Sequence, residues 1–285
     1  MPNDTPQAVA LAGASAMARR EPRDERIDTA AADEIAKDLL IMDRWDRLKR
    51  SQLANRNLMR LVAPIVETVP ALAGTIGDRD VTFFEVLANS GRLSEQCATH
   101  GVSQTFDSSF GPEWDITTDM GWQQMLRMSL KLKAGGVAWI APPEEATSGK
   151  TYINGKSSLV VSRLVAMSTL LWLRGGQLAW SHSVQSYAWR YPPVEELRNL
   201  ACTYTTKTNL RSYGHKLLKE FIIRHSCPEF YALEKNRLSR PRTSARDYHG
   251  EDDADILPWS FAEHVSQVVA TIVKNGACQK SIFEF

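Results

Sequence analysis

The chain has 285 residues, of which 43% are hydrophobic and 24% are charged, a composition typical of a globular protein with room for one large domain. Lys and Arg number 34 against 33 for Asp and Glu, so no overall field draws the chain to nucleic acid or to a membrane surface. Four scattered cysteines argue against a disulfide framework and favour an intracellular location, nuclear or cytoplasmic. The longest apolar run, around residues 164–173, is too short to cross a bilayer, so we expect no membrane span.

The first 75 residues divide into two parts. Residues 1–30 are rich in alanine and charged residues and predict a disordered tail, with organelle targeting as the alternative. Residues 31–75 carry apolar residues at helical spacing, and Pro64 and Pro70 are expected to end or bend these helices. We interpret this segment as a helical extension that caps the main domain. A separate helix that binds a protein partner is the alternative.

Strand and helix signals alternate through the remainder, residues 76–285. The first predicted elements are a strand over 81–89, a helix over 92–100, a strand over 102–106 and a helix from Thr117 or Thr118 to Gly135-Gly136. A strand over 137–141 and a helix over 159–173 follow. The last are a strand from 178 to 180, a helix over 195–200 and a β-rich run over 202–205. This alternation predicts an α/β, Rossmann-like fold with a mostly parallel sheet flanked by helices.

A parallel sheet binds ligands at the carboxyl ends of its strands, so the residues after each strand are the candidate site residues. The turn Asn89-Ser90-Gly91 has small residues that would let a ligand approach the backbone. The alternative is an ordinary strand-to-helix turn that binds no ligand. Asp107 could accept hydrogen bonds from both hydroxyls of a ribose. Asp115 could accept one from the amino group of adenine, or could simply cap a turn. With Gly91 as its only glycine, the turn disfavours a nicotinamide-dependent oxidoreductase.

The segments FFEVLANSGRLSEQCATHGV and FDSSFGPEWDITTDMGWQQMLRMSLKLKAGGVAWIAPP resemble the cofactor half of the S-adenosylmethionine-dependent cytosine carbon-5 DNA methyltransferases. LVVSRLVAMSTLLWLRGGQLAWSHSVQSYAWRYPPVEEL and Tyr213-Gly214 continue the likeness, which covers about residues 81–214. The resemblance implies a Rossmann-like methyltransferase fold and S-adenosylmethionine as the cofactor. The cofactor-binding residues that it implies are Glu85, Leu87, Asn89, Ser90, Gly91, Arg92 and Leu93 around the methionine part, Asp107 at the ribose, Asp115 and Ile116 at the adenine, and Pro142 at the start of the substrate-facing loop.

Two catalytic positions differ from the family. Its members carry a cysteine directly after the loop proline, and this thiolate attacks the base, whereas this chain reads Pro142-Pro143-Glu144-Glu145. The family's glutamate on the following strand is also missing, and His182 lies in that stretch. We therefore expect no covalent cytosine methylation. Glu144, Glu145 and His182 are the candidate bases for transfer to an oxygen or nitrogen acceptor, unless His182 lies on a degenerate loop without a role.

Local charge supplies the remaining prediction. Ten Lys or Arg residues oppose three Glu between residues 203 and 246, with aromatic residues interleaved, which suits nucleic acid, or else a solvated basic face. The spacing of His and Cys predicts no metal site. The sequence thus predicts a methyltransferase-like protein that binds S-adenosylmethionine and is atypical or catalytically degenerate. The alternative is a pseudoenzyme that acts as a nucleic-acid or protein interaction module.

Overall fold

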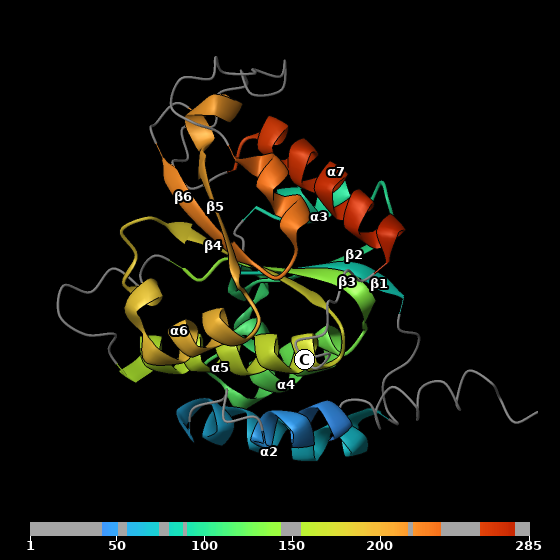
Figure 1. The fold of residues 1–285 in the computed structure, drawn as a ribbon, viewed down its shortest axis with the longest axis vertical. Helices are drawn as coiled ribbons and strands as arrows, with labels where there is room; N and C mark the ends of the chain where they lie inside the picture. Colours follow the sequence, from blue (N-terminus) through green and yellow to red (C-terminus); the bar gives the residue numbers. More distant parts are fainter. Residues whose placement is uncertain are drawn as a thin grey trace, which may run out of the picture. The chain divides into compact units, whose positions relative to one another are not determined.

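The computed structural model describes residues 42–50, 56–73, 80–87, 90–143, 155–215, 219–234 and 257–276. Within these, six strands form one mixed sheet (Figure 1). Their order across the sheet is β2 (Val102–Phe106), β1 (Val81–Val86), β3 (Leu132–Ile140), β4 (Gln177–Ser183), β6 (Glu220–His225) and β5 (Tyr204–Asn209). The first four are parallel, whereas β6 runs antiparallel to both of its neighbours. The prediction of an α/β fold with a mostly parallel sheet is confirmed.

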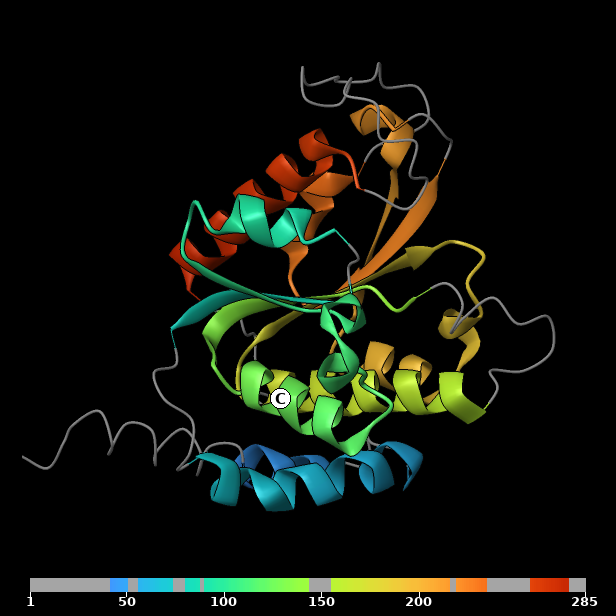
Figure 2. The same cartoon turned by 180° about the vertical axis from the view of Figure 1, so that it is seen from behind.

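Helices cover both faces of the sheet (Figures 1 and 2). Helices α4 (Asp119–Ser129), α5 (Gly155–Leu173) and α6 (Pro192–Leu200) lie on one face, and α3 (Arg92–Cys97) and α7 (Trp259–Asn275) lie on the other. Every residue of β1 is buried, and successive side chains enter opposite cores, Phe84 under α5 and Phe83 under α7. This two-sided burial explains why apolar residues occupy adjacent positions in VTFFEV and do not simply alternate with polar ones.

The boundaries of β3 and β6 correct the sequence prediction. The helix that Thr118 caps ends at Ser129, and β3 begins at Leu132 and runs through Gly135-Gly136, which were expected to stop the helix. Gly135 adopts φ 77° and donates its N–H to the carbonyl of Gly175, and the pairing of β1 with β3 shifts register at the same place. The glycines therefore form a bulge within a strand. Strand β6 was not predicted at all.

Helix α2 (Arg56–Ala73) contains both Pro64 and Pro70, so neither proline ends the helix; that they bend it stays a prediction. Pro64 is exposed, while Leu58 and Val62 are buried in the core that α5 also lines. That burial offsets the hydrogen bond that a proline cannot donate. A carboxylate oxygen of Glu196 on α6 accepts a hydrogen bond from the N–H of Leu58 at 3.2 Å and so caps the first turn. Within the part of the chain that is described, every helix is too short or too polar to span a bilayer.

Candidate functional site

The carboxyl ends of β2, β1 and β3 lie level with one another. Leu87 donates its N–H to the carbonyl of Phe106 at 2.8 Å, and Ala141 donates to the carbonyl of Val86 at 3.0 Å. The residues that follow, Asp107 after β2 and Pro142 after β3, therefore flank the turn between β1 and α3. Three of the predicted site segments thus meet at one edge of the sheet.

Glu85, at the end of β1, is a fully buried carboxyl group on the face under α3 and α7. Its Oε2 accepts a hydrogen bond from the N–H of Ser94 at 2.8 Å, whereas Oε1 has no hydrogen-bond partner among the described residues. Burial raises the pKa of Glu85 to about 7; hydrogen bonds from Ser94 oppose the rise, and the negative charge of Asp107 adds to it. Glu85 and Asp107 are therefore close enough to interact electrostatically.

The turn between β1 and α3 has an unusual backbone. Leu87 adopts φ 59°, and among the described residues it is the only non-glycine with a positive φ. Gly91 has φ 63°, and a Cβ built on it would meet nothing closer than Thr105 Oγ1 at 4.0 Å, so conformation rather than crowding requires a glycine there. Two residues with left-handed backbone, Leu87 and Gly91, thus follow the end of β1 within five positions. Asn89 lies outside the described residues.

Arg92 and Leu93 make contacts away from the turn. The guanidinium of Arg92 donates to the carbonyl of Leu257 at 2.8 Å and lies over the Trp259 ring, 5.0 Å from its centroid. It therefore joins α3 to the start of α7. The Leu93 side chain is fully buried in the core under α7, so only its backbone could meet a ligand. Ser90 is half-buried.

Asp107 and Asp115 both hold local turns. Oδ1 of Asp107 accepts from the N–H of Ser109 at 2.8 Å and caps the short helix η1 (Ser108–Phe110). The Trp114 ring, in η2 (Pro112–Trp114), packs on Phe106 with centroids 5.4 Å apart, which ties the Asp115 segment to the end of β2. Asp115 therefore fills the turn-capping role that was its alternative, and it does so beside the strand that carries Asp107.

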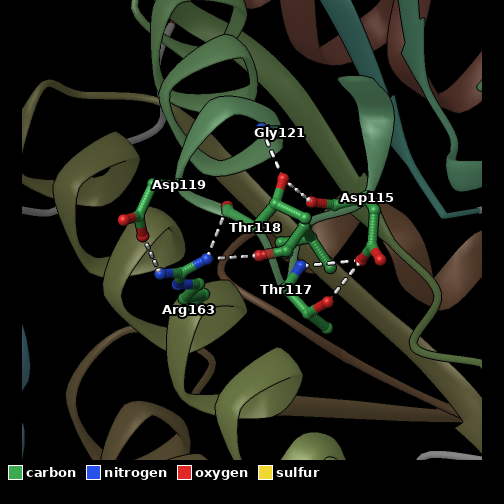
Figure 3. A network of polar contacts seen from close by, with 7 residues as sticks. Asp115, Thr117, Thr118, Asp119, Gly121 and Arg163 are labelled. Carbon is green, nitrogen blue, oxygen red and sulfur yellow. Dashed lines mark hydrogen bonds and ion pairs between the residues drawn. The ribbon is translucent and has the colours of Figure 1, made fainter. Parts of the chain in front are cut away.

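A network of polar contacts fixes the segment from Asp115 to Asp119 (Figure 3). Oδ1 of Asp115 accepts from the N–H of Thr117 at 2.8 Å and from its hydroxyl at 2.7 Å. Arg163, on α5, reaches the same segment from the other side. Ile116 is buried in the core below α5. Sequence reasoning missed Arg163; the only signal was an arginine in the middle of an apolar helix.

His182 lies within strand β4, so the alternative that it sits on a degenerate loop was wrong. It is buried, pairs in register with Ile222 of β6, and its ring donates a hydrogen bond to the Pro142 carbonyl after β3. Burial lowers the pKa of His182 to about 4, and the bond to Pro142 only partly opposes this, so the imidazole is neutral at pH 7. A neutral imidazole is the form that can take up a proton. Glu144 and Glu145 lie outside the described residues.

Of the basic residues in the segment over 203–246, the structure describes four, Lys207, Arg211, Lys219 and Arg224, and these differ in exposure. Arg224 is only 13% exposed, pairs with Glu195 at 3.2 Å, and stacks over the Trp189 ring at 4.6 Å. It is therefore part of the packing between β6 and α6. Lys207 and Arg211 are exposed, and residues 235–246 lie outside the described part. No group of three or more His, Cys, Asp or Glu among the described residues is arranged to hold a metal ion.

Comparison with protein-family models, with curated proteins and with solved structures found no significant match to this chain.

Proposed function

We propose that this protein binds S-adenosylmethionine at the carboxyl edge of its sheet and is an atypical methyltransferase or a degenerate one. The observation that carries the proposal is the convergence of Glu85, the left-handed residues Leu87 and Gly91, and Asp107 at the ends of adjacent parallel strands. The four parallel strands β2, β1, β3 and β4 support it, because an open α/β sheet binds its ligands at the carboxyl ends of its parallel strands.

The charges at this edge suit a cationic cofactor. S-adenosylmethionine carries a sulfonium and an ammonium group, and the two interacting carboxyl groups of Glu85 and Asp107 would favour positive charge nearby. Asp107 retains acceptor capacity for ribose hydroxyls, since each carboxylate oxygen has two lone pairs. Asp115 would face the adenine, because the Trp114 ring beside it packs on Phe106 and so holds this turn next to the end of β2.

Transfer of the methyl group would proceed without a covalent enzyme intermediate. His182 is the one candidate base that the described residues include, and it contacts Pro142, which begins the loop that the proposal assigns to the substrate. A nitrogen or oxygen acceptor needs mainly positioning and removal of a proton, which a neutral imidazole can supply. We propose His182 as that base if the protein is active.

Calorimetric titration with S-adenosylmethionine and with its demethylated product tests the binding. Asp107→Asn should weaken both by about tenfold or more, since it removes a charged acceptor. Asp80→Asn is the matched control, because Asp80 is exposed beside the opposite end of β1. Absence of binding to the unmodified protein would refute the proposal and favour an interaction module. Binding that Asp107→Asn leaves unchanged would place the cofactor elsewhere.

Catalysis is tested separately with labelled cofactor and candidate acceptors. Transfer that His182→Gln abolishes while cofactor binding persists would support the proposed base. Binding without transfer to any acceptor would identify a pseudoenzyme. Nucleic-acid binding through the basic segment over 203–246 stays a prediction, and its signature is affinity that falls steeply with salt.

A further inference from the structure

We propose that Arg163 is a positioning residue for the adenine side of this site: its guanidinium fixes the peptide group that orients the carboxylate of Asp115. This inference rests on the proposed function, and it assigns specificity for the 6-amino group of the purine to a residue that lies outside every predicted site segment.

The guanidinium of Arg163 reaches across from α5 to two backbone carbonyls. Nη1 donates to the carbonyl of Ile116 at 2.7 Å and to that of Thr118 at 2.7 Å (Figure 3). Nη2 also pairs with Asp119 at 3.0 Å, but Asp119 is 92% exposed, so water weakens this ion pair. The two carbonyl contacts, made by a side chain that is only 17% exposed, therefore carry most of the interaction.

The first of these contacts acts on Asp115 through a single peptide unit. The carbonyl of Ile116 and the N–H of Thr117 belong to the same planar trans peptide and point in opposite directions. When Arg163 holds that carbonyl, the N–H on the other side is directed at Oδ1 of Asp115, 2.8 Å away. The Thr117 hydroxyl donates to the same oxygen at 2.7 Å, so the carboxylate is held in one orientation.

The opposite side of the segment is held by α4. The N–H and the hydroxyl of Thr118 both donate to the Asp115 carbonyl at 2.9 Å, and the hydroxyl caps α4 by accepting from Gly121. A Cβ at Gly121 would lie 2.1 Å from the Asp115 carbonyl oxygen, so the helix touches this backbone directly. Asp115 is thus fixed between α4 and the guanidinium, which is the rigidity that discrimination between ligands requires.

The guanidinium itself is turned toward the protein. Arg163 lies over the Trp122 ring, 5.4 Å from its centroid, while its donors point at the 116–119 segment. We therefore assign it an effect on the ligand through Asp115 and not a contact with the ligand. Lysine cannot reproduce this arrangement, because a single ammonium lacks the planar fork of donors.

The test compares two ligands that differ in the 6-substituent and in the proton on the adjacent N1: S-adenosylhomocysteine, with a 6-amino group, and its deaminated 6-oxo analogue. The unmodified protein should prefer the 6-amino ligand, because a carboxylate accepts from an amino group but repels a carbonyl oxygen. Arg163→Met should weaken the 6-amino ligand by about tenfold and leave the 6-oxo ligand nearly unchanged, so the preference collapses. Arg163→Lys should fall in between. Arg127→Met, on the exposed side of α4, is the matched control and should change neither.

Thr117→Val provides a second variant that leaves Arg163 intact and removes only the hydroxyl bond to Asp115. It should reduce the same preference, and its effect combined with Arg163→Lys should be less than the sum, since both act on one carboxylate. Equal loss of both ligands, or an unchanged preference in Arg163→Met, would overturn the inference and leave the proposed function standing. Failure of the unmodified protein to bind either ligand would overturn both.

Discussion

Glu85→Gln is expected to remove a pH-dependent loss of stability. In the folded protein burial raises the pKa of Glu85 from 4.5 to about 7, so the folded state binds a proton more tightly than the unfolded chain does. Stability is therefore complete below pH 4.5 and declines as the pH rises toward 7. Over the range from pH 5 to pH 8 the loss from this one group amounts to about 2–3 kcal/mol, and glutamine, which does not ionise, should not show it.

Urea unfolding of both proteins at pH 5, 6, 7 and 8 measures this difference. In Glu85→Gln the amide N–H₂ would replace the carboxyl oxygen that has no hydrogen-bond partner, which costs about 1–3 kcal/mol at every pH. The diagnostic quantity is therefore how the difference in unfolding free energy between the two proteins changes with pH, and not the size of that difference at one pH. Glu95→Gln on the exposed face of α3 serves as the control. A constant difference between Glu85→Gln and the unmodified protein across this range would refute the assignment of Glu85 as the titrating group.

Three further outcomes are expected. The unmodified protein should lose about 2 kcal/mol of unfolding free energy through His182 between pH 7 and pH 5, because burial lowers the pKa of His182 from 6.5 to about 4 and protonation therefore favours the unfolded chain. His182→Gln should not show this loss in the same urea assay. An equal dependence of unfolding free energy on pH in both proteins would contradict this. Glu196→Ala should destabilise the first turn of α2 by about 1 kcal/mol, seen as faster hydrogen exchange at the Leu58 amide, and unchanged exchange would argue against the cap. Gly121→Ala should lower the free energy of unfolding by about 1–3 kcal/mol in urea, because the added methyl collides with backbone; an unchanged value would mean that the segment yields freely.

Local patterns were sufficient for the elements whose signals are contained in a few residues. The strand over 102–106 was predicted with its observed bounds, and Thr118 was one of two proposed caps for the following helix. The start of β3 was missed because Gly135-Gly136 normally end a helix, and only the pairing with β1 and the contact to Gly175 make them a bulge. Strand β6 was missed because Glu220–His225 was interpreted only as part of the basic segment over 203–246, although it pairs with both β5 and β4.

In the candidate site too, features with a local sequence signal could be predicted, and features that depend on distant contacts could not. The position of Asp107 directly after a strand could be predicted, since a strand end is a local signal and the meeting of strand ends follows from a parallel sheet. The contact between Arg163 and Ile116 spans 47 residues, and nothing near either residue marks it. The left-handed conformation of Leu87 was also beyond prediction, because leucine rarely adopts it and only the surrounding fold can impose it.

The order in which the two cores are completed along the chain has a consequence for synthesis. The core that contains Phe83 and Trp139 needs helix α7, which comes last in the described chain, to cover it. Until α7 has left the ribosome, one apolar side of a nearly finished sheet faces water. A nascent chain stalled before Trp259 should therefore be captured by chaperones or aggregate, whereas release of a few more turns of helix should end that exposure.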